Sequence, residues 1–128
     1  MSRPENDFAS LCPSGDGPLT TIRVGSHYRT SAQVTWQPCI GAPGFWIKPL
    51  YCDDRHGERS FLMRVDPGAV ATLHSHPTEF EQLFVVEGTF YDQNQTMVAG
   101  DYCCRAPGAK HTGGSENGAV LFVTYTSR

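Results

Sequence analysis

The sequence has few of the features that mark a nucleic-acid binder or a membrane protein. Its 128 residues include 10 Lys and Arg against 13 Asp and Glu, a net charge of −3, with no run of basic residues. Because proteins that bind a nucleic-acid backbone usually present a basic stripe, we expect no nucleic-acid partner. No apolar run approaches the ~20 residues of a membrane-spanning helix, and the first residues lack the pattern of a secretory signal. We therefore expect a cytoplasmic protein with no membrane partner.

Apolar residues at helical spacing are also absent, whereas turn-forming residues are abundant. The chain contains 13 Gly and 9 Pro, and no long window shows the i, i+3, i+4, i+7 pattern of an amphipathic helix. Short runs instead alternate between apolar and polar residues, which is typical of half-buried strands. We expect strands at residues 45–52, 59–66, 70–76, 82–87, 89–92 and 120–126. Short antiparallel strands in this number predict an all-β sandwich or barrel.

The composition predicts one domain preceded by a short arm. Residues 1–20 hold clusters of Pro, Gly and Ser and little apolar periodicity, so we expect an N-terminal arm or tail there. Residues 21–128 are predicted to form a single domain, which is an ordinary size for one hydrophobic core.

The five cysteines show no C-x-x-C spacing; they lie at positions 12, 39, 52, 103 and 104. An odd number without such pairs is typical of reduced thiols in a cytosolic protein, so we expect five free thiols. Cys103 and Cys104 are adjacent, and neighbours in a strand point to opposite faces. We therefore expect no disulfide between them and one inward-facing thiol.

Three histidines and a glutamate form the pattern with the clearest chemistry. His74 and His76 are two residues apart on a predicted strand, so both side chains leave the same face. Glu81 begins the next strand and can reach the same point, and His111 ends a short strand further along the chain. Imidazole nitrogens with one carboxylate suit Zn, Fe, Mn, Ni or Cu. The pattern predicts a transition-metal site.

This stretch resembles the first motif of the cupin superfamily. The motif consists of a glycine, five residues, H-x-H, three or four residues, a glutamate, six residues and a glycine. Gly68, His74, His76, Glu81 and Gly88 match every position. The resemblance implies a cupin double-stranded β-helix, that is, a jelly-roll barrel.

The second cupin motif is present in a looser form. Gly100, Gly108 and His111 fall at the expected positions, whereas Pro107 stands one place late and Ser115 replaces the closing Asn. The departures leave the histidine of the motif in place. The resemblance thus implies a divalent metal held by His74, His76, Glu81 and His111.

The amino-acid sequences of the strands resemble those of one cupin subgroup. This subgroup includes zinc-binding anti-sigma factors and dioxygenases that cleave aryl hydroxyketones or β-diketones. The anti-sigma type usually has three residues between the second histidine and the glutamate, which leaves Glu79 as an alternative to Glu81. The six-residue spacing to Gly88 favours Glu81 as the ligand. Glu81 is also the candidate catalytic residue, as a base that detaches from the metal.

Three functions remain open from the sequence. The first is a non-haem Fe(II) dioxygenase that acts on a small oxygen-rich or aromatic ketone. The second is a zinc-binding cupin that senses, binds or regulates. The third is an isomerase or lyase in which Zn, Mn or Ni acts as a Lewis acid.

Strand parity also suggests which side chains line the pocket and which lie outside it. Phe84 and Val86 alternate with the metal-facing residues of their strand, so we expect them in sheet packing or a subunit interface. The resemblance to cupins implies a homodimer. The candidate pocket walls are aromatic or apolar residues on five positions: Phe61, Met63, Phe90, Tyr102 and Phe122.

Overall fold

The computed structural model describes residue 22 and residues 24–128, so the predicted arm over residues 1–20 lies outside the described residues. Apart from a short 3-10 turn, η2 (Ser31–Gln33), every regular element in the described chain is a strand. The strands are β1 (Gln37–Pro38), β2 (Phe45–Asp53), β3 (Glu58–Val65), β4 (Val70–His74), β5 (Glu79–Tyr91), β6 (Thr96–Val98), β7 (Tyr102–Arg105), β8 (His111–Gly114) and β9 (Ala119–Ser127). The prediction of an all-β chain is confirmed.

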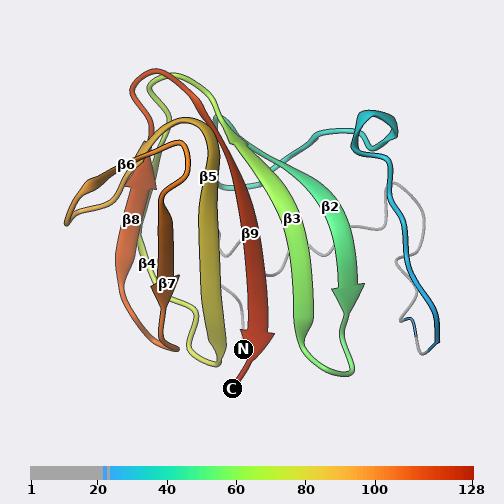
Figure 1. Cartoon of the computed structure of the whole chain (residues 1–128). Coiled ribbons are helices and arrows are strands. Elements are labelled where there is room, and N and C mark those ends of the chain that lie inside the picture. Colours follow the sequence, from blue (N-terminus) through green and yellow to red (C-terminus); the bar gives the residue numbers. More distant parts are fainter. Residues whose placement is uncertain (1–21, 23) are drawn as a thin grey trace.

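The strands form one curled antiparallel sheet in the order β1-β2-β3-β9-β5-β8-β4, with β6 and β7 paired to β5 (Figure 1). Strand β5 joins the two halves of the sheet. Its first part pairs with β7 and β9, and its last residues pair with β6 and β8. The two runs predicted at 82–87 and 89–92 are therefore parts of one long strand.

No helix in the described chain is long and apolar enough to span a membrane; a cytoplasmic location stays a prediction.

The concave side of the sheet holds the core. Along β9, buried residues alternate with more exposed ones, and the inward set is Ala119, Leu121, Val123 and Tyr125. Along β5 the same alternation buries Glu81, Leu83 and Val85 and leaves Phe84 and Val86 on the outside. Because successive strand residues point to opposite faces, this parity decides which side chains can reach the interior.

Gly88 and Ser115 fix the turn where β8 passes into β9. Gly88 has a φ of +78°, and a Cβ at this position would collide with the backbone of Gly118 and Ala119. Glycine is therefore required at this motif position, both because the backbone has a positive φ and because there is no room for a side chain. Ser115, which replaces the motif asparagine, is fully buried, and its hydroxyl donates to the Thr89 carbonyl and accepts from the Gly118 N–H at 2.8 Å. The serine thus stabilises the turn by its own hydrogen bonds.

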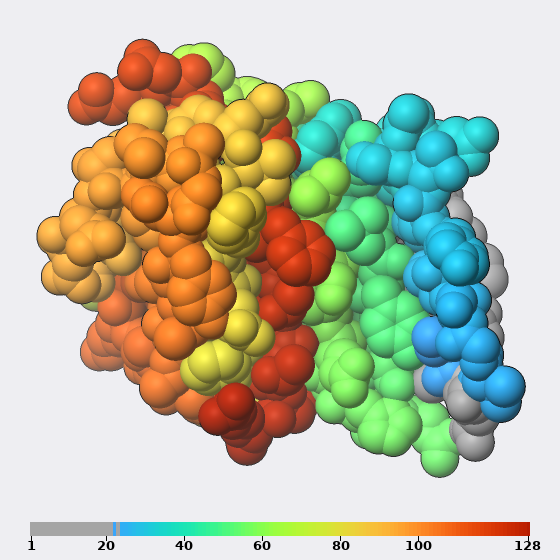
Figure 2. Space-filling view, viewed as in Figure 1, coloured from blue at the N-terminus to red at the C-terminus, as the bar shows by residue number. Residues whose placement is uncertain are grey.

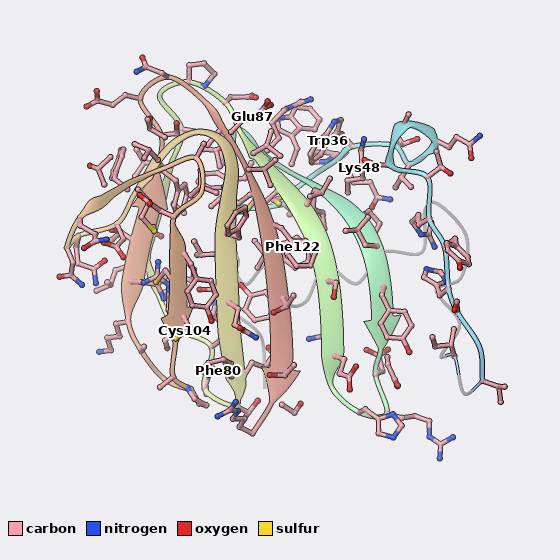
Figure 3. All side chains as sticks on the ribbon, in the orientation of Figure 1. Trp36, Lys48, Phe80, Glu87, Cys104 and Phe122 are labelled. Atoms are coloured by element: carbon pink, nitrogen blue, oxygen red, sulfur yellow. The ribbon has the colours of Figure 1, made fainter. Side chains whose placement is uncertain are left out.

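The segment before β2 packs on the outer face of the sheet. Lys48 of β2 lies 4.8 Å from the ring centre of Trp36, and Arg64 of β3 lies 5.1 Å from it. Figure 3 shows Trp36 and Lys48 side by side at one end of this face. Lys48 also donates to the Ser31 carbonyl at 2.8 Å, so a buried cation holds η2 against the sheet.

Two sequence predictions are wrong. Tyr102 and Phe122 were expected as pocket walls, but their side chains lie on the outer face, where they are 54% and 36% exposed. Figure 3 shows Phe122 in the middle of that face.

The expectation of five free thiols fails at Cys52, which is disulfide-bonded, whereas Cys39, Cys103 and Cys104 are free.

Candidate metal centre

The structure brings His74, His76 and His111 together inside the curled sheet. One ligand nitrogen from each ring lies within 4.8 Å of the others, and all three residues are buried. His74 ends β4 and His111 begins β8, and the two face each other in the β4–β8 ladder. His76 lies two residues beyond the end of β4 rather than in the predicted strand over 70–76. The three residues are up to 37 positions apart in sequence, and the β4–β8 ladder fixes two of them, His74 and His111.

Hydrogen bonds hold two of the rings in the form that binds a metal. The Nδ1 atom of His74 lies 2.7 Å from the Thr72 carbonyl, and that of His111 lies 3.1 Å from the Ala109 carbonyl. Since a carbonyl only accepts, this network assigns the proton to Nδ1 and leaves Nε2 as the unprotonated nitrogen. An outer hydrogen bond of this kind orients a ligating imidazole and increases its basicity toward the metal.

Burial also keeps His111 neutral. Desolvation lowers the pKa of this imidazole to about 4, against the partly opposing effect of the Glu81 carboxylate. A neutral imidazole is the metal-binding form, because a protonated ring has no free nitrogen lone pair. The donor set therefore fits a divalent transition metal of the Zn or Fe type.

Glu81 lies beside the histidines with both carboxylate oxygens hydrogen-bonded. Oε1 accepts from Arg105 Nε at 2.9 Å, and Oε2 accepts from the Tyr125 hydroxyl at 2.6 Å. Oε1 is 3.6 Å from His111 Nε2, and Oε2 is 3.9 Å from His76 Nε2. The Tyr125 oxygen is itself 3.1 Å from His76 Nε2. The assignment of Glu81 as a metal ligand or as a catalytic base stays a prediction.

Arg105 and Tyr125 reach Glu81 because of the sheet register. Arg105 of β7 and Tyr125 of β9 are the direct cross-strand partners of Glu81 on its two sides. Neither residue was predicted from the sequence. The available signal was the alternation in β9, in which Tyr125 follows Leu121 and Val123 on one face.

Arg105 is paired with a second carboxylate. The Nη1 atom of Arg105 donates to Asp92 Oδ2 at 3.0 Å, and Arg105 is only 9% exposed. Burial alone would lower the pKa of Arg105, but the Glu81 and Asp92 carboxylates raise it above its ordinary value. The guanidinium is therefore permanently charged, with two carboxylates around it.

Glu79, the alternative ligand, points to a different partner. Its Oε2 atom accepts from Arg59 Nη1 at 2.7 Å, and this pair joins the ends of β3 and β5. Glu79 is not a member of the three-histidine group.

A small cavity of about 20 Å³ lies next to the histidines. It is bounded by the polar groups of His74, Glu81, Arg105, His111, Thr112 and Tyr125 and by apolar walls from Phe45, Phe61, Met63, Ala71, Leu83, Phe90, Gly113 and Val123. The predictions of Phe61, Met63 and Phe90 as pocket walls are confirmed. The volume holds about one water molecule, so a larger ligand requires side chains to move.

The curled antiparallel sheet with buried histidines facing its interior defines a cupin. The chain belongs to the family of the ChrR Cupin-like domain, whose family model matches residues 24–127. The prediction of a cupin jelly roll is thereby confirmed, together with a three-histidine group that could hold a metal ion. No curated protein matches the sequence.

Solved structures similar to this chain are also cupins. An RmlC-like cupin from Shewanella frigidimarina is 21% identical, covering 81% of this chain and 93% of its own, with a TM-score of 0.71. A putative acetylacetone dioxygenase from Methylibium petroleiphilum is 17% identical, covering 84% and 81%, with a TM-score of 0.72. An acetylacetone dioxygenase from Acinetobacter johnsonii is 14% identical, covering 84% and 77%, with a TM-score of 0.70. At these identities the likeness shows the fold alone.

Proposed function

We propose that this cupin is a metal-dependent dioxygenase that cleaves a small diketone or hydroxyketone. The observation that carries the proposal is a group of three buried histidines, of which His74 and His111 are fixed with Nε2 unprotonated and line a cavity with apolar walls. Two of the similar structures are described as acetylacetone dioxygenases, one of them putatively. When bound, Fe(II) would supply oxygen activation, and Zn(II), Mn(II) or Ni(II) would supply Lewis-acid polarisation only.

The charges near the histidines favour a substrate that binds as a monoanion. The protein contributes one cation, Arg105, and two carboxylates, Glu81 and Asp92. With three neutral histidines and a divalent ion, the group carries one excess positive charge. An enolate of a diketone or hydroxyketone would neutralise it, whereas a dianion would leave a buried negative charge, which is costly.

The walls of the cavity favour short hydrocarbon substituents. Phe61, Met63, Phe90 and Val123 lie on its apolar side. On the polar side, Glu81 is the anionic group closest to the histidines and its Oε2 atom is linked to the Tyr125 hydroxyl. Glu81 is therefore the residue we assign to accept the acidic proton of the substrate, which then passes to solvent so that the bound enolate leaves the group neutral. The Tyr125 hydroxyl holds the Glu81 carboxylate in position.

The test is the metal content of anaerobically purified protein together with oxygen uptake on a panel of diketones and hydroxyketones. We expect about one iron per chain and substrate-dependent oxygen uptake. The His74→Ala variant should lose both, and the Glu79→Gln variant, outside the histidine group, should keep both. Iron without oxygen uptake on any member of the panel would overturn the dioxygenase proposal.

The family match favours a second candidate, a zinc-binding sensory or regulatory cupin domain. In this function the zinc would stabilise the domain or bind a regulatory ligand, and the protein would not convert any substrate. One zinc per chain, with no oxygen uptake after exchange for iron, would favour this candidate over the enzyme.

We also propose a homodimer that forms through the outer face of the sheet. Phe84 of β5 lies between Tyr102 of β7 and Phe122 of β9 in the cross-strand register, so three aromatic rings form a row. All three side chains are exposed, together with Val86. Figure 2 shows this face, on which the side chains of β5, β9 and β3 form a continuous surface. Exposed apolar surface of this kind is typical of an interface.

A further inference from the structure

A polar groove lies outside the cavity of the metal centre, and Arg105 borders both spaces. The groove has a volume of about 530 Å³, compared with about 20 Å³ for the inner cavity. Its polar lining comes from the turn between β5 and β6, from β7 and from the segment that leads into β8: Asp92, Gln93, Asn94, Gln95, Arg105 and Lys110. The groove has room for part of a ligand, and its lining suits a polar group better than a hydrocarbon.

Arg105 has one nitrogen left for a ligand at the boundary between the two spaces. Its Nε atom donates to Glu81 and its Nη1 atom donates to Asp92. The Nη2 atom is buried and has no hydrogen-bond partner among the described residues. Because a buried donor of a charged group without an acceptor is costly, an oxygen of a ligand at this position would be stabilising.

The charges along the groove favour a ligand group with a single negative charge. The Arg105 cation already pairs with two carboxylates, those of Glu81 and Asp92. Lys110 is exposed and forms no ion pair with a described residue. The described lining thus offers one unpaired positive charge, which a carboxylate would match and a doubly charged phosphate would exceed.

Gln93 closes the boundary between the groove and the histidines. Its Nε2 atom donates to the Lys110 carbonyl at 3.1 Å, and its Oε1 atom accepts from the Thr112 N–H at 3.0 Å. These two partners flank His111 in the chain. Exposed side-chain hydrogen bonds of this kind are easily exchanged for bonds to water, so the turn that carries Gln93 can move aside when a ligand larger than the inner cavity enters.

From these observations we propose that the substrate of the metal centre carries a carboxylate at one end, which lies in the groove and binds Lys110 and the Nη2 atom of Arg105. The substrate class is then a diketone or hydroxyketone with an acidic side chain, a statement that rests on the proposed function for its reacting end. The carboxylate lies beside Lys110, outside the group of charges that accepts one enolate. Its own charge is therefore balanced separately.

The test is a calorimetric titration of the zinc-loaded protein with two diketones that differ at one end. The first is butyrylacetone, and the second is its analogue in which a carboxylate replaces the terminal methyl group. We expect the wild type to bind the carboxylated analogue at least about tenfold more tightly, because hydrogen bonds to a charged group are the stronger ones. Equal affinities for the two diketones would overturn the inference.

Two variants show whether the groove is the cause of this preference, since the carboxylate could also bind the metal directly. In Lys110→Gln we expect the preference to fall below about threefold, which corresponds to the loss of one charge-assisted contact. Arg55→Gln is the matched control, because Arg55 is also exposed but lies in the turn between β2 and β3, outside the groove. It should keep the full preference. A preference that survives Lys110→Gln, or that falls equally in both variants, would overturn the inference.

Arg105→Lys is a second variant of the groove. It keeps a positive charge but removes the free Nη2 donor, so we expect a weaker preference for the carboxylated analogue than in the wild type. Lys110 is exposed, so the Lys110→Gln result decides the question even if the substitution of Arg105 prevents folding.

The outcomes separate this inference from the proposed function. A preference for the carboxylated diketone in the zinc form, without oxygen uptake in the iron form, would leave the inference standing and remove the dioxygenase. Oxygen uptake on both diketones with equal affinities would do the reverse. A metal-loaded protein that binds neither diketone and takes up no oxygen would overturn both.

Discussion

The Tyr125 hydroxyl donates a 2.6 Å hydrogen bond to Glu81 Oε2, and the two residues are direct cross-strand neighbours on β9 and β5. Both are buried, and the same phenol oxygen lies 3.1 Å from His76. The contact connects the folding of the sheet to the geometry of the metal centre, because the register that pairs β5 with β9 also sets the position of a polar group beside the histidines.

Replacement of Tyr125 by phenylalanine tests the energy of this contact. The variant keeps the ring in the core but removes the donor of a buried carboxylate oxygen, which costs about 1–3 kcal/mol of unfolding free energy. Urea denaturation of the metal-free proteins measures the loss. Tyr102→Phe is the matched control, because its hydroxyl also donates at 2.6 Å, to Gln82, but on the outer face. We expect less than about 0.5 kcal/mol there. Equal losses for the two variants would contradict the argument.

Replacement of Arg105 by methionine should be more damaging. It leaves Glu81 buried without its cationic partner and also removes the partner of Asp92, so we expect a loss of about 3–5 kcal/mol. The double variant Arg105→Met, Glu81→Gln should recover part of that loss, because the unpaired charge is removed. A double-mutant cycle by chemical denaturation measures the coupling. Strictly additive losses would show that the two residues do not interact in the folded protein.

The histidines could be predicted from the sequence because each stands at a position of one of two short motifs, although His74 and His111 are 37 residues apart. His74 and His111 end up in one ladder and His76 follows two residues later, as the motif requires. Arg105 and Tyr125 could not be found in this way. Their contacts with Glu81 span 24 and 44 residues, and they depend on a register in which a slip of one residue would turn each side chain to the other face.

The error at Phe122 has a related cause. In β9 both alternating sets contain apolar residues: Val120 and Phe122 on one face, and Leu121 and Val123 on the other. The periodicity then identifies a strand but does not show which of its faces points inward. That is decided by the strands that pair with it. The disulfide at Cys52 was missed because sequence spacing carries no information about which thiols meet in space.

The low pKa of His111 predicts a pH dependence for the metal-free protein. Burial lowers this pKa to about 4, from an ordinary value of 6.5, so the folded state favours the neutral ring. Between these values the unfolded chain binds more protons, and the stabilising contribution of the neutral ring, complete above pH 6.5, is lost as the pH falls toward 4. Urea midpoints measured across this range after chelation should therefore fall. The His111→Asn variant should show a flatter profile, and parallel profiles would contradict the assignment.

The row of Tyr102, Phe84 and Phe122 predicts how copies of the chain associate. A lysine at position 84 places a charge in the centre of the row, and burying it in an interface without a partner is costly. We expect the wild type to elute as a dimer in size-exclusion chromatography with light scattering, and Phe84→Lys as a monomer with an unchanged circular dichroism spectrum. Leu73→Lys is the control, because Leu73 is equally apolar and 59% exposed but lies on β4, away from the row. It should remain dimeric. A wild-type monomer at micromolar concentration, or a dimer that survives Phe84→Lys, would rule out this face as the interface and leave its aromatic row without an assigned role.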